Sequence, residues 1–560
     1  MGILTLLLVL LPAGLLSWPL GKYLFRVMEP PAAYESRMGR VNRCWIRLGG
    51  SALREEQTWK RYLIALLIFN AAMFALCFAV LAMQQHLPLN PDGKGKLEWS
   101  LTFNTTASFV TNTNLQHYSG EAAMSYFSQM FALMWLQFVS AATGLAALLA
   151  LARGLAGQVK VGNFYRDLLN GAFLVLLPLA LLVGILLVLG GVPMTFDGAA
   201  VVKTLEGATQ TICRGPVAAM VAIKQLGTNG GGFFGANSAH PFENPSYYTN
   251  LIECIGIIVL PMACVWLFGR VTKRMKHAAV IFIVMALLLI AKTALALYWE
   301  SAPTAAFKGL AITADANLEG KEMRFGGGAG AVWSVVTTCT SNGSVNCMHD
   351  SLNPLTGMIP MIGMWLNSTF GGVGVGLINM FLYIIVGVFI CGMMVGRSPE
   401  YLRHKVETGE MKLALLALLV HPLLILGGTA LFVVTAWGAA TTGNPGIHGF
   451  SEILYEFSSA AANNGSGFEG LGDNTIPWNI ATGIVMLLGR FLPIALPLAI
   501  AGMLGAKKPI PETAGTLHTD TPMFGLVMLG SVVFIGALLF LPVAVLGPIA
   551  EHLQALAGVK

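Results

Sequence analysis

The stretch GTNGGGFFGANSAHP, residues 227–241, is polar and rich in glycine, yet it lies between two long apolar segments. Glycine has no side chain to pack, and its backbone is costly to order. The stretch therefore gains little by forming a buried helix or strand. We expect one of two roles for it. It is either a loose connection, or a segment whose bare backbone the protein uses directly.

The composition places this stretch in a membrane protein. Of the 560 residues, 55% are hydrophobic and 11% are charged, and the mean hydropathy is +0.70. Soluble domains carry about 25% charged residues. The first apolar run lacks the basic flank and cleavage site of a signal peptide, so we expect a retained helix. Ten apolar runs are long enough to span a bilayer, at 3–24, 62–84, 126–152, 172–193, 251–270, 278–299, 372–396, 412–436, 479–505 and 524–547.

The loops between these runs alternate in charge. Five loops, beginning at residues 25, 153, 271, 397 and 506, hold 19 Lys and Arg in 96 residues. The other four, 85–125, 194–250, 300–371 and 437–478, hold 8 in 212 residues. The positive-inside rule then predicts that the basic loops are cytoplasmic and that both termini lie outside. The net charge of +6 comes from these short clusters and gives no indication of nucleic-acid binding.

Each of the four long loops holds a semi-apolar stretch too short or too broken to span, followed by a polar turn. This pattern is typical of re-entrant segments, since irregular backbone at membrane depth needs protein, water or ions around it. The turns read TNTN (111–114), TNGG (228–231), SNGS (341–344) and NNGS (463–466). Aligned on Asn112, Asn229, Asn342 and Asn464, they recur at spacings of 117, 113 and 122.

These recurrences predict an all-α membrane protein with a fourfold internal repeat of helix, re-entrant loop and helix around a central pore. One extra helix lies at each end. The repeats are 62–152, 172–270, 278–396 and 412–505. Residues 1–61 hold the first helix and a basic cytoplasmic loop, and residues 524–560 hold the last helix and an external tail.

Four such turns can meet on one axis, where their carbonyl oxygens replace the water shell of a monovalent cation. The short helices before the turns would aim their negative ends at the same point. The turns contain no carboxylate, which argues against a divalent ion and favours potassium over sodium. The expected filter residues are Thr111, Asn112, Thr113, Asn114 and Gln116; Thr228, Asn229, Gly230, Gly231 and Gly232; Ser341, Asn342, Gly343 and Ser344; and Asn463, Asn464, Gly465 and Ser466.

Three further residues are candidates for a barrier or for coupling. Arg490 lies mid-helix, where a charge is costly, and either forms a positive barrier below the filter or ties helix ends to carbonyls. Arg397 is either a coupling residue or a positive-inside anchor. Phe233 either narrows the path beside the site or packs the returning chain. Gln116 likewise either lines the filter or stabilises its loop, and the glycines of 370–379 suggest either a moving loop or close helix packing.

The motifs TNTNLQ, GTNGGGFFGANSAHPFENP, NNGSGF and VGRSPEYL, in a chain of ten helices, resemble the potassium-binding A subunits of the Kdp potassium-transporting ATPases, relatives of the Trk and Ktr transporters. The resemblance covers essentially the whole chain. It implies capture of external potassium and its transfer through an intramembrane tunnel to a P-type ATPase B subunit. It also implies a C subunit, a small F subunit and the bacterial inner membrane.

Two other functions remain open at this point. A self-sufficient potassium channel or secondary transporter of the Trk or Ktr type would share the repeat and the filter. A membrane enzyme would need converging acid, base or nucleophile groups, and the sequence shows none. The chain has neither a Walker A motif nor a DKTG motif, so we expect it to bind potassium but no ATP. Cys339 and Cys347 share one loop, and a disulfide between them is left open.

Overall fold

The structure is a computed structural model that describes residues 2–29, 44–47, 49–304, 316–511 and 517–557. Part of the basic loop expected after the first helix, residues 30–43, lies outside these ranges. Ten helical segments in the described part are long and apolar enough to cross a membrane, which confirms the all-α prediction. They are Gly2–Met28 (α1), Trp59–Ala82 (α4), Ser128–Leu155 (η3 and α7), Phe164–Leu189 (α8, η4 and α9), Tyr247–Val271 (α11), Met275–Glu300 (α12), Val375–Met394 (α15), Thr408–Val434 (α16), Ile476–Gly505 (α19) and Pro522–Ala557 (α20, η7 and α21).

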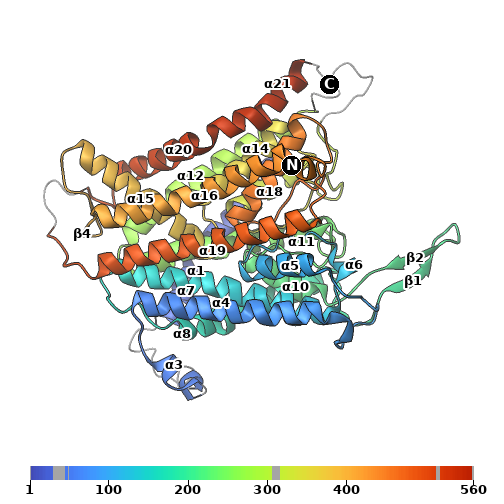
Figure 1. Cartoon of the computed structure of the whole chain (residues 1–560), viewed down its shortest axis with the longest axis horizontal. Coiled ribbons are helices and arrows are strands. Elements are labelled where there is room, and N and C mark those ends of the chain that lie inside the picture. Colours follow the sequence, from blue (N-terminus) through green and yellow to red (C-terminus); the bar gives the residue numbers. More distant parts are fainter. Residues whose placement is uncertain (1, 30–43, 48, 305–315, 512–516, 558–560) are drawn as a thin grey trace.

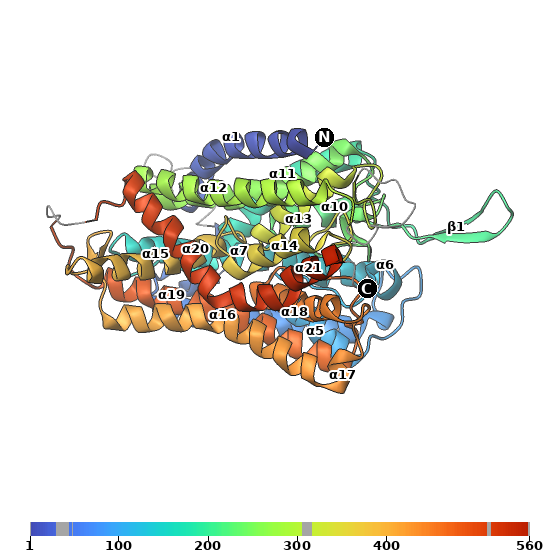
Figure 2. The ribbon, with the colours of Figure 1, turned by 90° about the horizontal axis from the view of Figure 1, so that it is seen from above.

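The spans form an inner and an outer layer around the turns. The inner spans are those that follow the four turns, and 83%, 78%, 72% and 61% of their central windows is buried, in chain order. In the other six spans the share is 22–39%. The outer helices present leucine and isoleucine outward, as on Leu181, Ile185 and Leu423, which suits contact with lipid. Figures 1 and 2 show the spans running side by side through the bundle.

Four short helices fill the centre of one half of the bundle, and each ends at a polar turn. They are α5 (Trp99–Val110), α10 (Val217–Leu226), α13 (Gly327–Cys339) and α18 (Ile447–Ala462). With 10 to 16 residues they are too short to cross a bilayer. They confirm the predicted re-entrant segments. The start of α1 and the end of α21 lie at this end of the bundle, opposite the hairpin of β3 (Glu400–Tyr401) and β4 (His404–Lys405) (Figure 1).

The second unit contains a hairpin that the sequence reading did not separate. The loop 194–250 was expected to hold one semi-apolar re-entrant stretch before its polar turn, but its earlier part forms the antiparallel strands β1 (Ala200–Lys203) and β2 (Thr209–Ile212), with Val201 opposite Thr211. The hairpin projects beyond the bundle (Figure 2). Its β-branched residues favour strands over helix, and α10 begins only at Val217.

The third unit also departs from the expected plan. The loop predicted at 300–371 contains a buried 13-residue helix, α14 (Pro354–Leu366). After it the chain leaves helical geometry at Asn367, where φ is 43°, and Gly371 and Gly374 have φ of 60° and 79°. Helix α15 begins at Val375. The glycines of 370–379 therefore mark an interruption between two helices, and we call residues 367–374 the interrupting loop.

Candidate cation site formed by the four polar turns

Each short helix ends in a turn with the same backbone form. Two residues in every turn have φ in the left-handed region, with one residue of ordinary φ between them. Non-glycine residues rarely adopt such angles, and strained backbone of this kind concentrates at functional sites. The pairs are Asn112 and Asn114 (64° and 55°), Thr228 and Gly230 (49° and 82°), Ser341 and Gly343 (49° and 90°), and Asn463 and Gly465 (52° and 103°).

The hydrogen bonds of the turns define how the four repeats align. The middle residue of each turn donates its backbone N–H to the carbonyl five residues earlier, at 2.8–2.9 Å. These middle residues are Thr113, Asn229, Asn342 and Asn464. The sequence alignment on Asn112 was therefore wrong by one residue in the first turn. That alignment matched asparagine with asparagine. The feature that repeats is the backbone conformation of the turn, and not the side chain.

The turns contact one another in a closed ring. A Cβ built on Gly230 would lie 1.8 Å from the carbonyl oxygen of Asn342. A Cβ on Gly343 would lie 2.1 Å from that of Asn464, and one on Gly465 would lie 2.1 Å from that of Thr113. Only glycine fits such approaches.

Side chains complete the ring. The amides of Asn342 and Asn464 donate to carbonyls of the preceding unit, at 3.1 and 3.0 Å. The amide of Asn112 donates to the Thr228 carbonyl at 2.8 Å, which joins the first turn to the second. The four units therefore follow one another in chain order around one axis.

The carbonyl oxygens of the four middle residues have no protein partner. Thr113, Asn229, Asn342 and Asn464 are fully buried, yet within the described ranges none of their carbonyl oxygens accepts a hydrogen bond. Nearly all buried carbonyls in native proteins are paired, so an unpaired group calls for water or an ion. The four short helices also direct their negative C-terminal ends to this point. The arrangement suits a monovalent cation stripped of its water shell.

The backbone of the second turn is also held in place by hydrogen bonds to side chains outside the turn. The carbonyl of Gly230 accepts from the Asn237 amide at 2.7 Å, and that of Gly231 accepts from Gln137 at 3.1 Å. Gln116 binds Gly232 twice, accepting from its N–H at 2.8 Å and donating to its carbonyl at 3.1 Å. Gln116 is thus placed as a support of the glycine loop.

The remaining expected filter residues support the turns through hydrogen bonds. Ser344 and Ser466 donate their backbone N–H to the side chains of Asn342 and Asn464, at 2.9 and 3.0 Å. Thr111 contacts Thr113 through their hydroxyls at 2.7 Å. Asn463 donates to the Thr113 hydroxyl at 2.9 Å, and Asn114 accepts from Gln137 at 3.1 Å.

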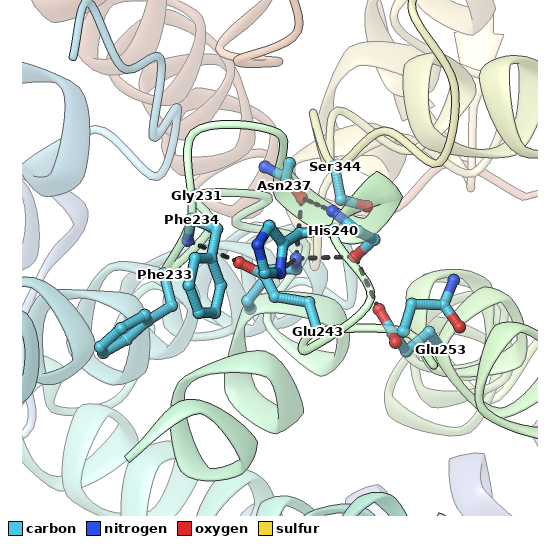
Figure 3. Close-up of polar contacts among 12 residues, drawn as sticks. Gly231, Phe233, Phe234, Asn237, His240, Glu243, Glu253 and Ser344 are labelled. Carbon is cyan, nitrogen blue, oxygen red and sulfur yellow. Dashed lines mark hydrogen bonds and ion pairs between the residues drawn. The ribbon is translucent and has the colours of Figure 1, made fainter. Parts of the chain in front are cut away.

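A buried ion pair behind the second turn was missed by the sequence reading. Lys224 occupies the position that Ser108, Thr337 and Ser459 hold in the other short helices. Its ammonium pairs with Glu243 and donates to Asn237 and Ser238, each at 2.7 Å; both charged side chains are fully buried. Glu243 also accepts from the N–H of Phe234 at 2.8 Å (Figure 3). The lone lysine in the apolar run before GTNGGG is the signal that could have revealed it.

The interrupting loop contacts the end of α13 and the second turn. Its Gly371 N–H donates to the Cys339 carbonyl and its Val373 N–H donates to the Thr228 hydroxyl, both at 3.0 Å. Two buried cations accompany it. Lys292 donates to Thr369 of this loop at 2.8 Å.

Arg490 is the second of these cations, and its guanidinium donates to the Ser140 carbonyl at 3.0 Å. A Cβ on Gly144 would lie 3.2 Å from it and 2.4 Å from the Val373 carbonyl. In the described residues neither Lys292 nor Arg490 has a carboxylate within ion-pair distance. Two positive charges therefore lie beside the loop that backs the ring.

Comparison with known proteins identifies the family. The family model described as the potassium-transporting ATPase A subunit matches residues 5–553. The chain belongs to this family. It is 49% identical over 552 residues to a potassium-transporting ATPase potassium-binding subunit from Phocaeicola vulgatus, covering 96% of this chain and 97% of that protein. The protein of the same name from Pseudomonas entomophila is 49% identical, with 98% and 97% coverage. Among solved structures, the potassium transporter TrkH from Vibrio parahaemolyticus aligns at 16% identity and a TM-score of 0.49, over 88% of this chain and 96% of that one.

The other two candidates for barrier or coupling lie away from the ring of this A subunit. Arg397 is exposed in the turn that follows α15. The Phe233 ring packs against Tyr126, with ring centroids 6.1 Å apart, and points away from the polar network (Figure 3). The position of Phe233 agrees with packing of the returning chain, whereas the role of Arg397 stays a prediction. The cysteines Cys339 and Cys347 are buried and free, so the disulfide left open is not formed.

Two clusters of histidine and carboxylates connect α18 with the loops that follow the turns. In the first, His117 contacts Glu456, Asp473 and Asn479. Burial alone would lower the pKa of His117, but Asp473 and Glu456 raise it to about 9. In the second, His448 bridges Asp350 and Glu551 at 2.9 and 2.8 Å. His349 is fully buried beside it and contacts the Tyr455 hydroxyl at 2.9 Å. Asp350 therefore takes part in an ion-pair cluster with His448.

Proposed function

We propose that this chain is the potassium-binding and translocating subunit of an ATP-driven potassium uptake complex. The observation that carries the proposal is the ring of four buried carbonyl oxygens without partners, in a chain that matches the A-subunit family over nearly its whole length. Potassium from outside the cell binds in the ring and is passed on within the membrane. The filter residues expected in all four turns form this site or support it, and each of the segments 62–152, 172–270, 278–396 and 412–505 contributes one turn.

A sideways path is favoured over an exit straight along the axis. The interrupting loop, Lys292 and Arg490 lie on the inner side of the ring. A cavity of about 330 Å³ at the opposite end of the bundle is lined by residues of four basic loops, each of which follows one unit, among them Arg274, Arg403 and Lys507. Cations along this route repel potassium.

To the side, a cavity of about 40 Å³ begins at the interrupting loop, at Asn367, and is also lined by Asn379, Tyr383 and His421. We assign this cavity to the start of the path toward a P-type ATPase B subunit. A C subunit and a small F subunit complete the complex. The chain lies in the bacterial inner membrane with both termini outside, and ATP is hydrolysed by the partner and not by this chain.

The self-sufficient channel is the competing function, and one experiment separates the two. The chain is reconstituted in liposomes alone and with its partner subunits, and ATP hydrolysis and passive potassium flux are measured. We expect potassium-stimulated hydrolysis only with the partners, no stimulation by sodium, and no passive flux through the chain alone. Potassium flux through the isolated chain without ATP would establish the channel and refute the proposal.

A further inference from the structure

The first histidine cluster joins the first and fourth units close to their turns. His117 follows Gln116 in the loop after the first turn, Glu456 lies on α18, and Asp473 lies in the loop after the fourth turn. The His117 Nε2 atom lies 3.2 Å from Glu456 Oε1 and 3.8 Å from Asp473 Oδ2. The side chains of His117 and Glu456 are buried, whereas that of Asp473 is 27% exposed. One ring nitrogen thus faces two carboxylates, with solvent on one side.

The other ring nitrogen is oriented by an amide. His117 Nδ1 lies 2.7 Å from Asn479 Oδ1. The Asn479 nitrogen is engaged elsewhere, donating to Ser100 at 3.1 Å and to Asn474 at 3.3 Å. An amide oxygen only accepts, so Nδ1 bears a proton and Nε2 is left for the carboxylates. Histidines that bind metals show this arrangement, in which the second N–H donates to a neighbouring oxygen.

The spacing of the three ligand atoms fits a small divalent ion. Zinc is bound by imidazole nitrogen and carboxylate oxygen at about 2.0–2.2 Å, most often in tetrahedral geometry. Ligand atoms then lie about 3.4 Å apart, close to the 3.2 and 3.8 Å found here. All three ligand atoms lie within 4.8 Å of one another. A water molecule on the exposed side of Asp473 would take the fourth position.

We propose that His117, Glu456 and Asp473 form a binding site for a divalent transition-metal ion of the zinc class. On binding, any proton on Nε2 passes to solvent and the nitrogen lone pair binds the metal. The metal would fix the loop after the first turn onto α18, whose C-terminus forms the fourth turn. It would also replace a proton by a doubly charged ion near the ring, which opposes the approach of potassium.

The second cluster provides a matched control. There both ring nitrogens of His448 face carboxylates, Asp350 at 2.9 Å and Glu551 at 2.8 Å. The imidazole therefore serves as a cation between two anions, and no ring nitrogen is set aside by a neutral oxygen. The two clusters have similar composition, so they distinguish ligand geometry from mere negative charge.

The test measures metal binding directly, on the chain in complex with its partner subunits. The purified complex is treated with a chelator and titrated with Zn²⁺ by calorimetry, and with Co²⁺ by visible absorption. We expect one ion per chain and the intense absorption of four-coordinate Co²⁺. Asp473→Asn and His117→Gln each remove a ligand, so each should weaken zinc binding by more than the roughly 10- to 100-fold that loss of an outer-shell partner costs, whereas Asp350→Asn should leave it unchanged. Absence of stoichiometric binding, unchanged binding in Asp473→Asn, or equal loss in Asp350→Asn would each overturn the site.

A second measurement concerns potassium and rests on the proposed function. Zinc should raise the potassium concentration needed for half-maximal ATP hydrolysis in the unaltered complex, but not in Asp473→Asn. If zinc binds as described and this concentration does not change, the site stands and its effect on the ring is refuted. If potassium does not stimulate hydrolysis at all, the proposed function fails while the binding result remains valid.

Discussion

Replacing Gly343 by alanine tests the ring directly. The new Cβ would lie 2.1 Å from the Asn464 carbonyl oxygen, 0.9 Å short of the 3.0 Å that such contacts need, and both partners are turn backbone. Relief must therefore displace one of the four ring oxygens. Interactions with a charged group contribute about 1.5–3 kcal/mol each. Loss of one oxygen should weaken potassium binding by about 10- to 150-fold.

The assay is potassium-stimulated ATP hydrolysis by the purified complex, measured over a range of potassium concentrations. Alanine at a left-handed φ also costs roughly 1–2 kcal/mol by itself, so a control for that cost is needed. Gly396→Ala provides it, because Gly396 lies in the turn after α15, with φ of 71° and no atom within 4 Å of an added Cβ. We expect a normal potassium requirement in the control. If Gly343→Ala inserts normally and shows the same potassium requirement, the ring does not bind the ion.

Three further predictions concern charges around the ring. Lys224→Met leaves Glu243 buried without its cation, so the complex should lose about 3–5 kcal/mol of stability in thermal denaturation. Adding Glu243→Gln should recover part of this stability. Equal stability of the unaltered, single-variant and double-variant complexes would contradict the pairing. Arg490→Gln should raise passive potassium efflux from liposomes, and unchanged efflux would show that this charge is no barrier. Burial and nearby Lys321 lower the pKa of His349 to about 3, below the value near 6.5 of an unfolded histidine. Only the unfolded state then gains this proton as the pH falls from 6.5 toward 3, which costs about 2 kcal/mol of stability at pH 5. His349→Gln should remove this loss of stability. Identical acid sensitivity of the variant and the unaltered protein would refute the prediction.

The sequence predicted correctly those features that depend on one continuous segment of the chain. A transmembrane span depends on the transfer of about 20 consecutive residues out of water, so hydropathy alone located all ten spans. The short helices were found because they are apolar but too short to span. The hairpin of β1 and β2 and the helix α14 were missed, since each is a brief segment inside a long loop of mixed character.

The candidate site shows the same division. That four polar turns recur, and that they contain no carboxylate, can be read from the letters, and this suffices to expect a monovalent cation. The one-residue error at Asn112 arose because the repeat lies in φ angles and hydrogen bonds, which Thr113 satisfies as well as asparagine does. The lone Lys224 in an apolar run signals a buried cation, but no local pattern names Glu243 as its partner or predicts the convergence of His117, Glu456 and Asp473.

By itself, then, the sequence determined that this protein crosses the membrane ten times and carries four similar turns, because burial in lipid and repetition are properties of single segments. Tertiary structure alone decided which carbonyl oxygens lack a hydrogen-bond partner, which glycines the close approaches require, and which residues lie next to the ring. Gly343 and Asn464 are more than 100 residues apart, as are Arg490 and Ser140. Their contacts exist only once the four units close around one axis.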